Sequence, residues 1–483
     1  MNFIIKLFSE ITIKSKSVRL YFIRTLTNNI NNILKKISKE ILVVRKWDYI
    51  EVYIYDLSKY DKICDELTRI PGINYFLEVE KKTFLNLDDI FKEVYSIYSI
   101  QLKNKTFCVR VKRKGKHKFS SIEAESYIGF MLNNSIKSSI VKLKNQDITI
   151  HLEIKDNILF IVKSRFNGIG GFPIGTQENV LSLISGGIDS CVSSYMLIRR
   201  GCCVHYCFFN IGNIEYEIKV KEIAYYLWKR FGSTHNVKFF IIDFKFLVSE
   251  IIKKVKSDQI SIILKRMMIK AASKIAKHYN IQAIATGESL GQVSSQTIIN
   301  LNIINNISSL IVLRPLIAYD KEVIIEISRK IGTEKFTKNI PEYCTKFLKK
   351  QTAKAIQSSI ETEENKIDYN ILDVAIKSVE YVDFNQFFFK KIKVNLKVEV
   401  VNKIFSKNEI ILDIRTIDEY KTKPLFIKGV EIKHIPFYKL NTQFPILPKN
   451  KTYLLYCERG IMSRLQALIL NEKGFFNIKI YRP

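Results

Sequence analysis

The first 165 residues alternate between strand-like runs of β-branched and aromatic residues and segments whose apolar positions have helical spacing. The strand-like run NFIIKLF is followed by a helical pattern over 17–37 and by further strand-like residues over 41–55. This order predicts a small α+β domain over residues 1–60. A turn at Pro71–Gly72 and the later strand-like segments ITIHLEI and ILFIVKS predict a second α+β domain over residues 61–165.

From Asn179 onward, apolar strand-like segments alternate with helical ones. The expected strands include VLSLI, CVHYCFF, VKFFIIDF and IQAIAT, and the expected helices include CVSSYMLIRR and LKRMMIKAASKIAKHY. Such alternation predicts a doubly wound parallel α/β sheet, in a domain over residues 166–400 that closes with helices over 351–384. The strands EIILDIR and TYLLYC and the amphipathic segment SRLQALILNEKGF predict a last, small α/β domain over residues 404–483. The chain is therefore expected to be a multidomain α+β and α/β protein.

Length and composition agree with several domains. A chain of 483 residues is too long for one hydrophobic core, and 47% hydrophobic residues supply material for more than one. The net charge of +30 favours a polyanionic partner such as nucleic acid. An AT-rich genome would also produce this abundance of Lys, Ile and Asn. The net charge alone is therefore weak evidence for a nucleic-acid partner, and the local clustering of positive charge is the better indicator.

The sequence gives no sign of a membrane protein. Charged residues interrupt the first apolar segment, MNFIIKLFSEITIK, and no apolar run is long enough to span a bilayer. The eight cysteines show no paired C-x-x-C spacing. These observations fit a reducing compartment. We therefore expect a cytoplasmic protein with no membrane partner.

Positive charge is clustered between Gln101 and Ser120, where eight Lys or Arg residues occur without an acidic residue. The cluster is densest in RVKRKGKHKF, for which we expect a basic hairpin with Gly115 at its tip. The candidate RNA-binding residues there, called the basic segment below, are Lys112, Arg113, Lys114 and Lys116. Such a run suits contact with phosphates, but it is as often only a solvated face, and the sequence leaves both interpretations open.

The segment LSLISGGIDSCVSSYML places a glycine pair between a buried strand and a helix. Gly186 and Gly187 allow the backbone to approach an anion, and the start of the following helix offers free N–H groups. Ser185 and Ser190 add hydroxyl donors, and Asp189 is a candidate ligand for Mg²⁺. The alternative is an ordinary glycine-rich turn with a serine cap, which a bare Gly-Gly pair would favour. The full pattern of strand, SGGxDS and helix instead predicts a phosphate site.

Cys457 follows a strand-like run and begins the loop CERGIMSR. Backbone N–H groups of such a loop and the start of the next helix stabilise a thiolate, and Arg459 and Arg464 add positive charge. A buried structural cysteine is the weaker alternative. The loop therefore predicts a cysteine that is readily ionised to the thiolate.

Several motifs resemble those of one family along nearly the whole chain. The motif SGGIDS resembles the pyrophosphate loop of the PP-loop ATPases, which cleave ATP to AMP and pyrophosphate. The segments KLFSEITIKS, RVKRKGKH, GIGGFPIGTQE, TGESLGQVSSQT, PEYC and LLYCERGIMSRLQA resemble the tRNA 4-thiouridine synthetases. The resemblance implies a ferredoxin-like domain, a THUMP RNA-binding domain, a PP-loop domain and a rhodanese domain.

The resemblance also implies an activity. Enzymes of this family use ATP and Mg²⁺ to adenylate O4 of uridine 8 in tRNA, and a rhodanese persulfide then supplies sulfur. By position, the persulfide is expected on Cys457, a second redox-active cysteine at Cys344, and a cation needed for activation at Lys321, whose alternative role is a helix-cap cation. The implied nucleotide contacts, beyond the residues of the loop already named, are Leu183, Ile184, Lys265, Gly287 and Gln296.

The implied partners are tRNA, a cysteine desulfurase that loads Cys457, and the sulfur-carrier protein of thiamine synthesis. Two other functions stay open from the residues alone. The first is a PP-loop enzyme that adds a different group to tRNA, as in lysidine formation, although the CERGIMSR loop argues against it. The second is an RNA-binding protein with an inert rhodanese domain.

Overall fold

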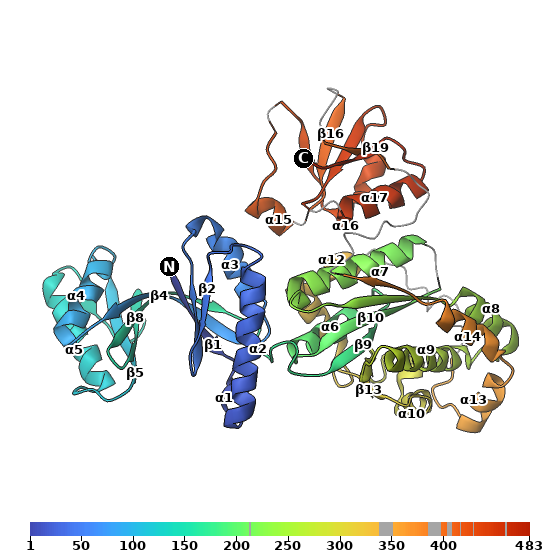
Figure 1. The fold of residues 1–483 in the computed structure, drawn as a ribbon, viewed down its shortest axis with the longest axis horizontal. Helices are drawn as coiled ribbons and strands as arrows, with labels where there is room; N and C mark the ends of the chain where they lie inside the picture. The colour runs from blue at the N-terminus through green and yellow to red at the C-terminus, as the bar shows by residue number, and fades with distance from the viewer. Residues whose placement is uncertain are drawn as a thin grey trace. The chain divides into compact units, whose positions relative to one another are not determined.

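The computed structural model describes residues 1–211, 214–337, 351–384, 398–402, 408–415, 417–427, 429–458 and 461–483. The chain divides into two compact units, Met1–Pro173 and Ile174–Pro483, and each is described by itself (Figure 1). No helix within the described part of the chain is long and apolar enough to cross a membrane.

The first unit is built on one mixed sheet of eight strands in the order β2-β3-β1-β4-β8-β7-β5-β6. Its strands are β1 (Asn2–Leu7), β2 (Leu42–Arg45), β3 (Tyr49–Tyr53), β4 (Ile73–Thr83), β5 (Thr106–Lys114), β6 (Ile140–Val141), β7 (Ile148–Lys155) and β8 (Ile158–Asn167). Its helices are α1 (Ser9–Thr12), α2 (Lys16–Leu34), the 3₁₀ turn η1 (Leu57–Lys59), α3 (Tyr60–Leu67), α4 (Leu87–Tyr98) and α5 (Ser121–Ser135).

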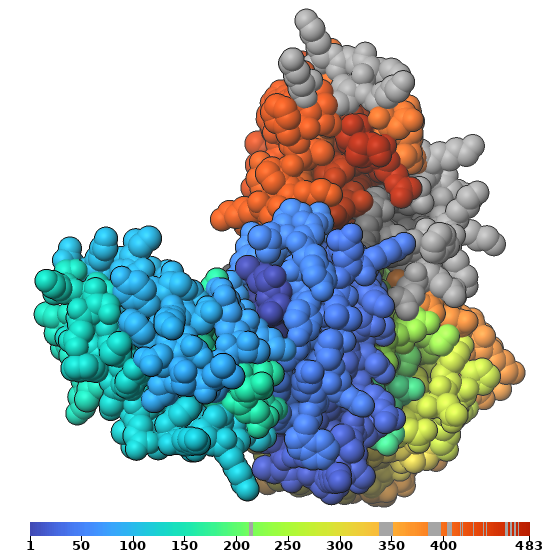
Figure 2. All heavy atoms as spheres, turned by 60° about the vertical axis from the view of Figure 1, so that its left-hand side comes forward, coloured from blue at the N-terminus to red at the C-terminus, as the bar shows by residue number. Residues whose placement is uncertain are grey.

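The long strand β4 joins the two halves of this sheet. It pairs antiparallel with β1 on one side and with β8 on the other. In the first half, residues of α2 and α3 form a core with β1, β3 and the start of β4. In the second half, α4 and α5 form a separate core with β5, β7 and β8. Figure 2 shows these two halves adjoining at the surface, the first in dark blue and the second in lighter blue to teal.

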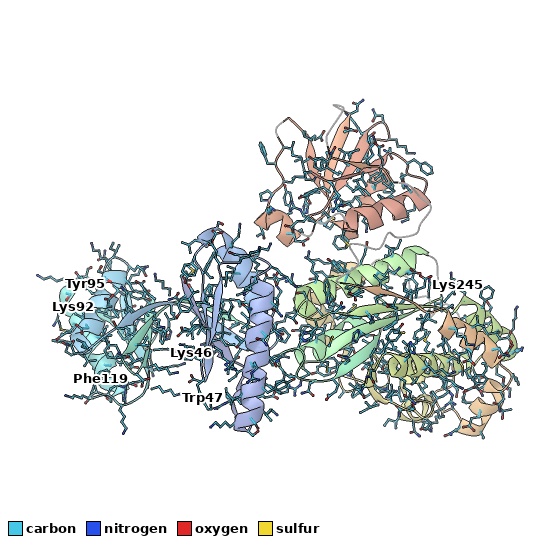
Figure 3. All side chains as sticks on the ribbon, viewed as in Figure 1. Lys46, Trp47, Lys92, Tyr95, Phe119 and Lys245 are labelled. Atoms are coloured by element: carbon cyan, nitrogen blue, oxygen red, sulfur yellow. The ribbon has the colours of Figure 1, made fainter. Side chains whose placement is uncertain are left out.

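Two short connections in this unit bear on the sites described below. Lys46 and Trp47 lie in the turn between β2 and β3, beside α2 (Figure 3). The expected basic hairpin is not formed, because β5 pairs in parallel with both β6 and β7 and leads into α5 instead. Ser120 caps α5 in a reciprocal capping box with Glu123, which fixes where the helix begins.

The second unit begins with a six-stranded sheet in the order β13-β12-β9-β10-β11-β14. Its strands are β9 (Asn179–Leu183), β10 (Cys203–Asn210), β11 (Lys238–Asp243), β12 (Ala283–Ala285), β13 (Ile311–Leu313) and β14 (Glu380–Asp383). Its helices are α6 (Ile188–Arg199), α7 (Ile214–Leu227), the π-helix η2 (Trp228–Gly232), α8 (Lys245–Lys254), α9 (Ile260–His278), the 3₁₀ turn η3 (Ser294–Gln296), α10 (Ile298–Asn305), α11 (Lys321–Ile331), α12 (Glu334–Thr337), α13 (Gln357–Glu364) and α14 (Tyr369–Lys377).

Five of these six strands are parallel, and only the edge strand β14 runs antiparallel, to β11. Strands buried on both faces are mostly apolar, as in β10, where every residue from Cys203 to Asn210 is buried and only His205 and Asn210 are polar. The predicted doubly wound α/β domain is therefore confirmed. Because β9 and β12 are parallel neighbours, the loops that follow them leave the same edge of the sheet.

A smaller sheet of five strands, in the order β15-β19-β18-β16-β17, completes the second unit. Its strands, all paired in parallel, are β15 (Val400–Val401), β16 (Glu409–Asp413), β17 (Ile432–His434), β18 (Thr452–Tyr456) and β19 (Ile478–Tyr481). Its helices are α15 (Ile417–Thr422), α16 (Phe437–Gln443), the 3₁₀ turn η5 (Phe444–Ile446) and α17 (Ile461–Glu472). Cys457 follows the central strand β18.

Candidate active site

The glycine-rich loop joins the end of β9 to the start of α6. Gly186 has a φ of 78°, a left-handed conformation that residues with a side chain rarely adopt, and Gly187 is the N-cap of α6. The Ser190 hydroxyl donates to the Gly187 carbonyl at 3.0 Å and accepts from the Ser185 N–H at 3.3 Å. These bonds hold the loop in a tight arc at the helix start, which is the geometry that binds phosphate.

The loop after β12 packs directly against this arc. A Cβ atom built on Gly287 would lie 2.6 Å from the carbonyl carbon of Asp189 and 2.7 Å from the N atom of Ser190. The Ser193 hydroxyl of α6 also donates to the Thr286 carbonyl at 2.8 Å. Gly287 is therefore required so that the two loops can touch.

Lys321 comes to the same place from a third segment, as the first residue of α11. Its Nζ lies 2.6 Å from Oδ1 of Asp189, and Gln292 Nε2 donates to Oδ2 of Asp189 at 3.0 Å. Its side chain is 45% exposed, so the ammonium group can reach a bound anion. The structure thus brings together Asp189 and Lys321, which are 132 positions apart in the sequence.

Glu288, which the sequence analysis did not identify, organises two cations beside these loops. Lys265 Nζ lies 2.8 Å from Oε1 of Glu288, and Arg314 Nε lies 2.9 Å from Oε2. Burial alone would raise the pKa of Glu288, but Lys265 and Arg314 lower it below its ordinary value. Glu288 therefore stays ionised and holds both cations in place. Its position one residue after Gly287 was the only signal in the sequence.

Two further residues of this region have different surroundings. Gln296 is buried, and its Oε1 has no hydrogen-bond partner among the described residues, so it offers a free acceptor. Arg266, which directly follows Lys265 in the sequence, is buried, with its Nε 2.5 Å from Oε2 of Glu364 and its Nη1 donating to the Ile303 carbonyl. Arg266 is therefore committed to the packing of α9 and α13. Of the other predicted nucleotide residues, Leu183 ends β9, and Ile184 is buried directly before the loop.

Cys457 lies directly after strand β18 of the smaller sheet, as the glycine-rich loop lies after strand β9 of the larger one. Only 8% of its surface is exposed, and Ser463 of α17 donates to its Sγ from Oγ at 3.0 Å and from N at 3.4 Å. The cavity beside it is lined by Arg415, whose guanidinium is bound to both carboxylate oxygens of Asp413. Arg415 was not predicted. Hydrogen-bond donors to Sγ suit a thiolate or a persulfide anion, whereas the charge of Arg415 is balanced by Asp413. The predicted residues Cys344, Arg459 and Gly460 lie outside the described residues.

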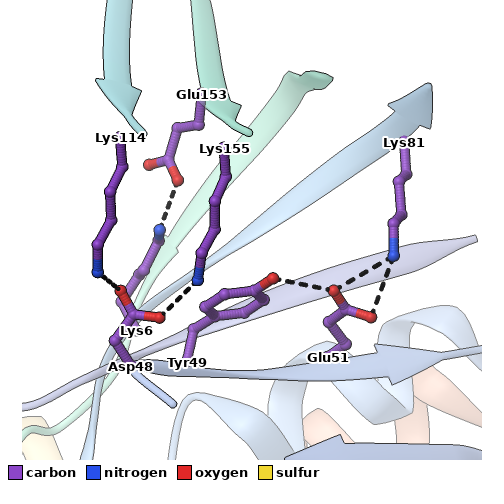
Figure 4. Close-up of polar contacts among 8 residues, drawn as sticks. All are labelled: Lys6, Asp48, Tyr49, Glu51, Lys81, Lys114, Glu153 and Lys155. Atoms are coloured by element: carbon purple, nitrogen blue, oxygen red, sulfur yellow. Dashed lines mark hydrogen bonds and ion pairs between the residues drawn. The ribbon is translucent and has the colours of Figure 1, made fainter. Parts of the chain in front are cut away.

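The basic segment divides into exposed and paired members. Lys112 and Lys116 are exposed, whereas Lys114 pairs with Asp48 at 2.7 Å. Asp48 also pairs with Lys155 at 2.8 Å, so the carboxylate of Asp48 forms ion pairs with two lysines (Figure 4). Burial would raise the pKa of Asp48, but the two lysines lower it overall. Arg113 donates to the Gly115 carbonyl at 3.1 Å and thereby shapes the loop. Lys112 and Lys116 are thus the members best placed to contact phosphate.

Four family models match successive parts of the chain. Family models match residues 2–76 (ThiI ferredoxin-like domain), 85–162 (THUMP domain), 175–369 (thiamine biosynthesis protein, ThiI) and 397–482 (rhodanese-like domain). A tRNA sulfurtransferase of Escherichia coli (strain K12) is 56% identical over 483 residues, with 100% of both chains covered. The chain belongs to the tRNA sulfurtransferase family. A tRNA sulfurtransferase of Shigella flexneri is also 56% identical, again over 100% of both chains.

Solved structures agree with this assignment to the tRNA sulfurtransferases. A 4-thiouridine synthetase in complex with RNA and bound ATP matches with a TM-score of 0.69 and 27% identity, covering 79% of this chain and 99% of that chain. A protein of Pyrococcus horikoshii matches in fold, with a TM-score of 0.53 and 20% identity, over 69% of this chain and 100% of that chain. The expected enzyme class and the expected kinds of domain are thereby confirmed.

Proposed function

We propose that this tRNA sulfurtransferase uses ATP to activate O4 of uridine 8 in tRNA and replaces that oxygen with sulfur from a persulfide on Cys457. The products are 4-thiouridine, AMP and pyrophosphate. The observation that carries the proposal is the meeting of Asp189, Gly287 and Lys321 at the glycine-rich loop. The 4-thiouridine synthetase of similar structure holds both RNA and ATP.

The loop supplies the groups that an ATP triphosphate needs. The proposed phosphate donors are the N–H groups of Gly186 and of the first turn of α6, where the helix dipole favours negative charge, whereas the Gly187 N–H donates to Oγ of Ser185 at 3.4 Å. Lys321, released from Asp189, balances the charge of the departing pyrophosphate. Lys265 adds a cation whose position Glu288 holds. Gln296 is the proposed partner of a donor on the nucleotide, such as the adenine amino group, and its buried Oε1 would have to become accessible when ATP binds.

Asp189 fits a magnesium site. Mg²⁺ usually takes one or two protein carboxylates and completes its coordination with substrate phosphates and water. Asp189 is the carboxylate on the loop itself, and among the described residues its two oxygens are held by the side chains of Lys321 and Gln292. When bound, the ion would neutralise charge on the phosphates of ATP. The carboxylate would then exchange the ammonium group of Lys321 for the metal, which frees Lys321 for the phosphates.

The sulfur step follows from the chemistry of the adenylated uridine. The outer sulfur of the Cys457 persulfide attacks C4, the C4–O4 bond breaks, and AMP leaves with that oxygen. A second thiol, which we assign to Cys344, then attacks Sγ of Cys457. The S–S bond of the persulfide breaks, its outer sulfur stays on the uridine, and a Cys344–Cys457 disulfide remains. A dithiol reductant must reduce this disulfide before the next turnover.

Ser463 prepares Cys457 for this step. Its two donors stabilise negative charge on Sγ when Cys457 is the thiolate that accepts sulfur from the desulfurase, whereas in the later step Sγ is the atom that Cys344 attacks and the outer sulfur is the leaving group. A cysteine desulfurase is the expected source of the persulfide. The match to the model for thiamine biosynthesis proteins favours a second role, in which Cys457 passes sulfur to the sulfur-carrier protein used for thiazole formation.

Mass analysis of nucleosides tests the main proposal. Purified enzyme is incubated with tRNA, ATP, Mg²⁺, cysteine and a cysteine desulfurase, and the tRNA is then digested. We expect uridine 8 to show the mass increase of an oxygen-to-sulfur exchange, with one AMP and one pyrophosphate released per sulfur added. A different added group would favour an enzyme of the lysidine type. RNA binding without release of pyrophosphate would favour a binding protein, and either result would refute the proposal.

A further inference from the structure

Trp47 is an exposed indole in a basic part of the first unit. It lies in the turn between β2 and β3, and 46% of its surface is exposed. The guanidinium of Arg19 lies 4.5 Å from the centre of its ring, and Nζ of Lys16 lies 5.7 Å from it. Figure 3 shows Trp47 next to Lys46 at the side of α2. A large exposed aromatic ring surrounded by cations has no role in the core of its domain.

We propose that Trp47 is a stacking platform for an unpaired base of the bound tRNA, with Arg19 and Lys16 contacting the phosphates beside that base. The inference rests on the proposed function, since it names one more contact of the same substrate. Proteins that bind single-stranded nucleic acid combine cations that follow the backbone with aromatic rings on which bases stack. Both components are present here within one turn and one helix face.

The charges around Trp47 are available to an anionic partner. No ion pair among the described residues involves Lys16, Arg19 or Lys46, in contrast to the paired Lys114 and Lys155 nearby in the fold. The Nε of Arg19 is buried and has no hydrogen-bond partner within the described part of the chain. Since this N–H is shielded from solvent, it is the positive charge of the guanidinium that attracts a partner, and a cation beside an aromatic ring with no carboxylate partner among the described residues favours a phosphate over a neutral or basic protein surface. RNA is therefore the occupant to which the surroundings are complementary.

The turn that carries Trp47 is held in place. The Lys46 N–H donates to the Tyr49 carbonyl at 3.0 Å, which closes the turn. Asp48 anchors it through its ion pairs with Lys114 and Lys155, which lie on β5 and β7 (Figure 4). A platform that is rigid before binding loses little conformational entropy when a base stacks on it. The ion pairs of Asp48 with Lys114 and Lys155 therefore also hold the neighbouring Trp47 in position.

Tryptophan fluorescence of the full-length protein provides a direct test. The chain has two tryptophans, and the other, Trp228, is only 4% exposed and donates its Nε1–H to the His235 carbonyl. A change in emission when tRNA is added to the wild-type protein therefore reports mainly on Trp47. We expect bound tRNA to quench this emission and to protect the Trp47 ring from further quenching by acrylamide. Trp47→Phe should lose the response and keep the affinity for tRNA within a few-fold, because a phenyl ring still stacks.

The affinity for tRNA tests the same contact independently. Trp47→Ala should weaken binding about 5- to 150-fold, the range for removal of a base-stacking ring, and should leave the salt slope unchanged because no charge is lost. Tyr55→Ala is the matched control, since Tyr55 is a 67% exposed aromatic residue of the same domain, and its affinity should stay within about twofold of wild type. Wild-type emission that does not respond to bound tRNA, or equal affinities of Trp47→Ala and wild type, would overturn the inference. Failure of the proposed function is distinguishable, because it appears as a wild-type protein that does not thiolate tRNA, whereas failure of this inference appears in the binding and fluorescence measurements while thiolation is intact.

Discussion

Replacing Gly287 with alanine should disable the phosphate site while the protein stays folded. The added Cβ would lie 2.6 Å from the Asp189 carbonyl carbon and 2.7 Å from the Ser190 N atom, whereas ordinary contact begins at 3.4 Å. These are backbone atoms, which cannot turn aside as the end of a flexible side chain can. The loop after β12 and the start of α6 must therefore separate by about 0.8 Å.

This displacement moves the glycine-rich loop relative to Lys321, and both must act on the same phosphates. A misplacement of about 1 Å lowers the rate of an enzymatic step by about 100-fold, which corresponds to about 2.7 kcal/mol in activation free energy. We therefore expect tRNA-dependent release of pyrophosphate to fall about 100-fold. The affinity for tRNA should stay close to wild type, because the RNA contacts proposed here lie in the first unit.

Pyrophosphate release, tRNA affinity and thermal unfolding are measured side by side on the variant and on Gly129→Ala. Gly129 is a helical glycine of α5 with nothing within 4 Å of an added Cβ, so its substitution controls for the chemical change alone. An activity of Gly287→Ala within threefold of wild type would show that contact between the two loops does not position the phosphates. A loss of folding would instead be seen as a large drop in melting temperature.

Five other changes test the remaining steps of the mechanism and one contribution to stability. Asp189→Ala should abolish thiolation and leave tRNA affinity nearly unchanged, and a large loss of binding would contradict the separation of the two sites. Neutralising the four residues of the basic segment together should weaken tRNA binding and flatten its salt dependence, because fewer counterions are released, whereas an unchanged slope would make the segment a solvated surface. Cys457→Ser should accept no sulfur from a desulfurase yet still adenylate tRNA. Cys344→Ser should carry the persulfide on Cys457 but fail to form the disulfide, which non-reducing peptide mapping would show. Normal turnover of Cys344→Ser would refute the role of Cys344. Burial raises the pKa of Glu222, which accepts a hydrogen bond from Gln466 at 2.8 Å, to about 8. The stability that Glu222 contributes is therefore complete below its ordinary pKa of 4.5 and is lost as the pH rises toward 8. Glu222→Gln should remove this pH dependence of the melting temperature, and an unchanged dependence would contradict the assignment.

Local pattern in the sequence was sufficient for most of the architecture. Mostly apolar runs such as β10 predicted a buried parallel sheet, because a strand covered on both faces has no polar side. The motif around Gly186 and Gly187 predicted the loop between β9 and α6, because a tight turn at a helix start needs glycine and small polar residues next to each other. These features depend on neighbours in the chain, so the sequence by itself determined them.

Only the tertiary structure decided which distant residues meet. The pairing of Lys321 with Asp189 and of Lys265 and Arg314 with Glu288 depends on how the sheet brings the ends of its strands to one edge. Only the tertiary structure shows that Arg266 forms an ion pair with Glu364, and that Lys114 and Lys155 both form ion pairs with Asp48. A sequence shows how many charges a segment carries, but whether a charge is free for a substrate depends on the counter-charges that folding places beside it.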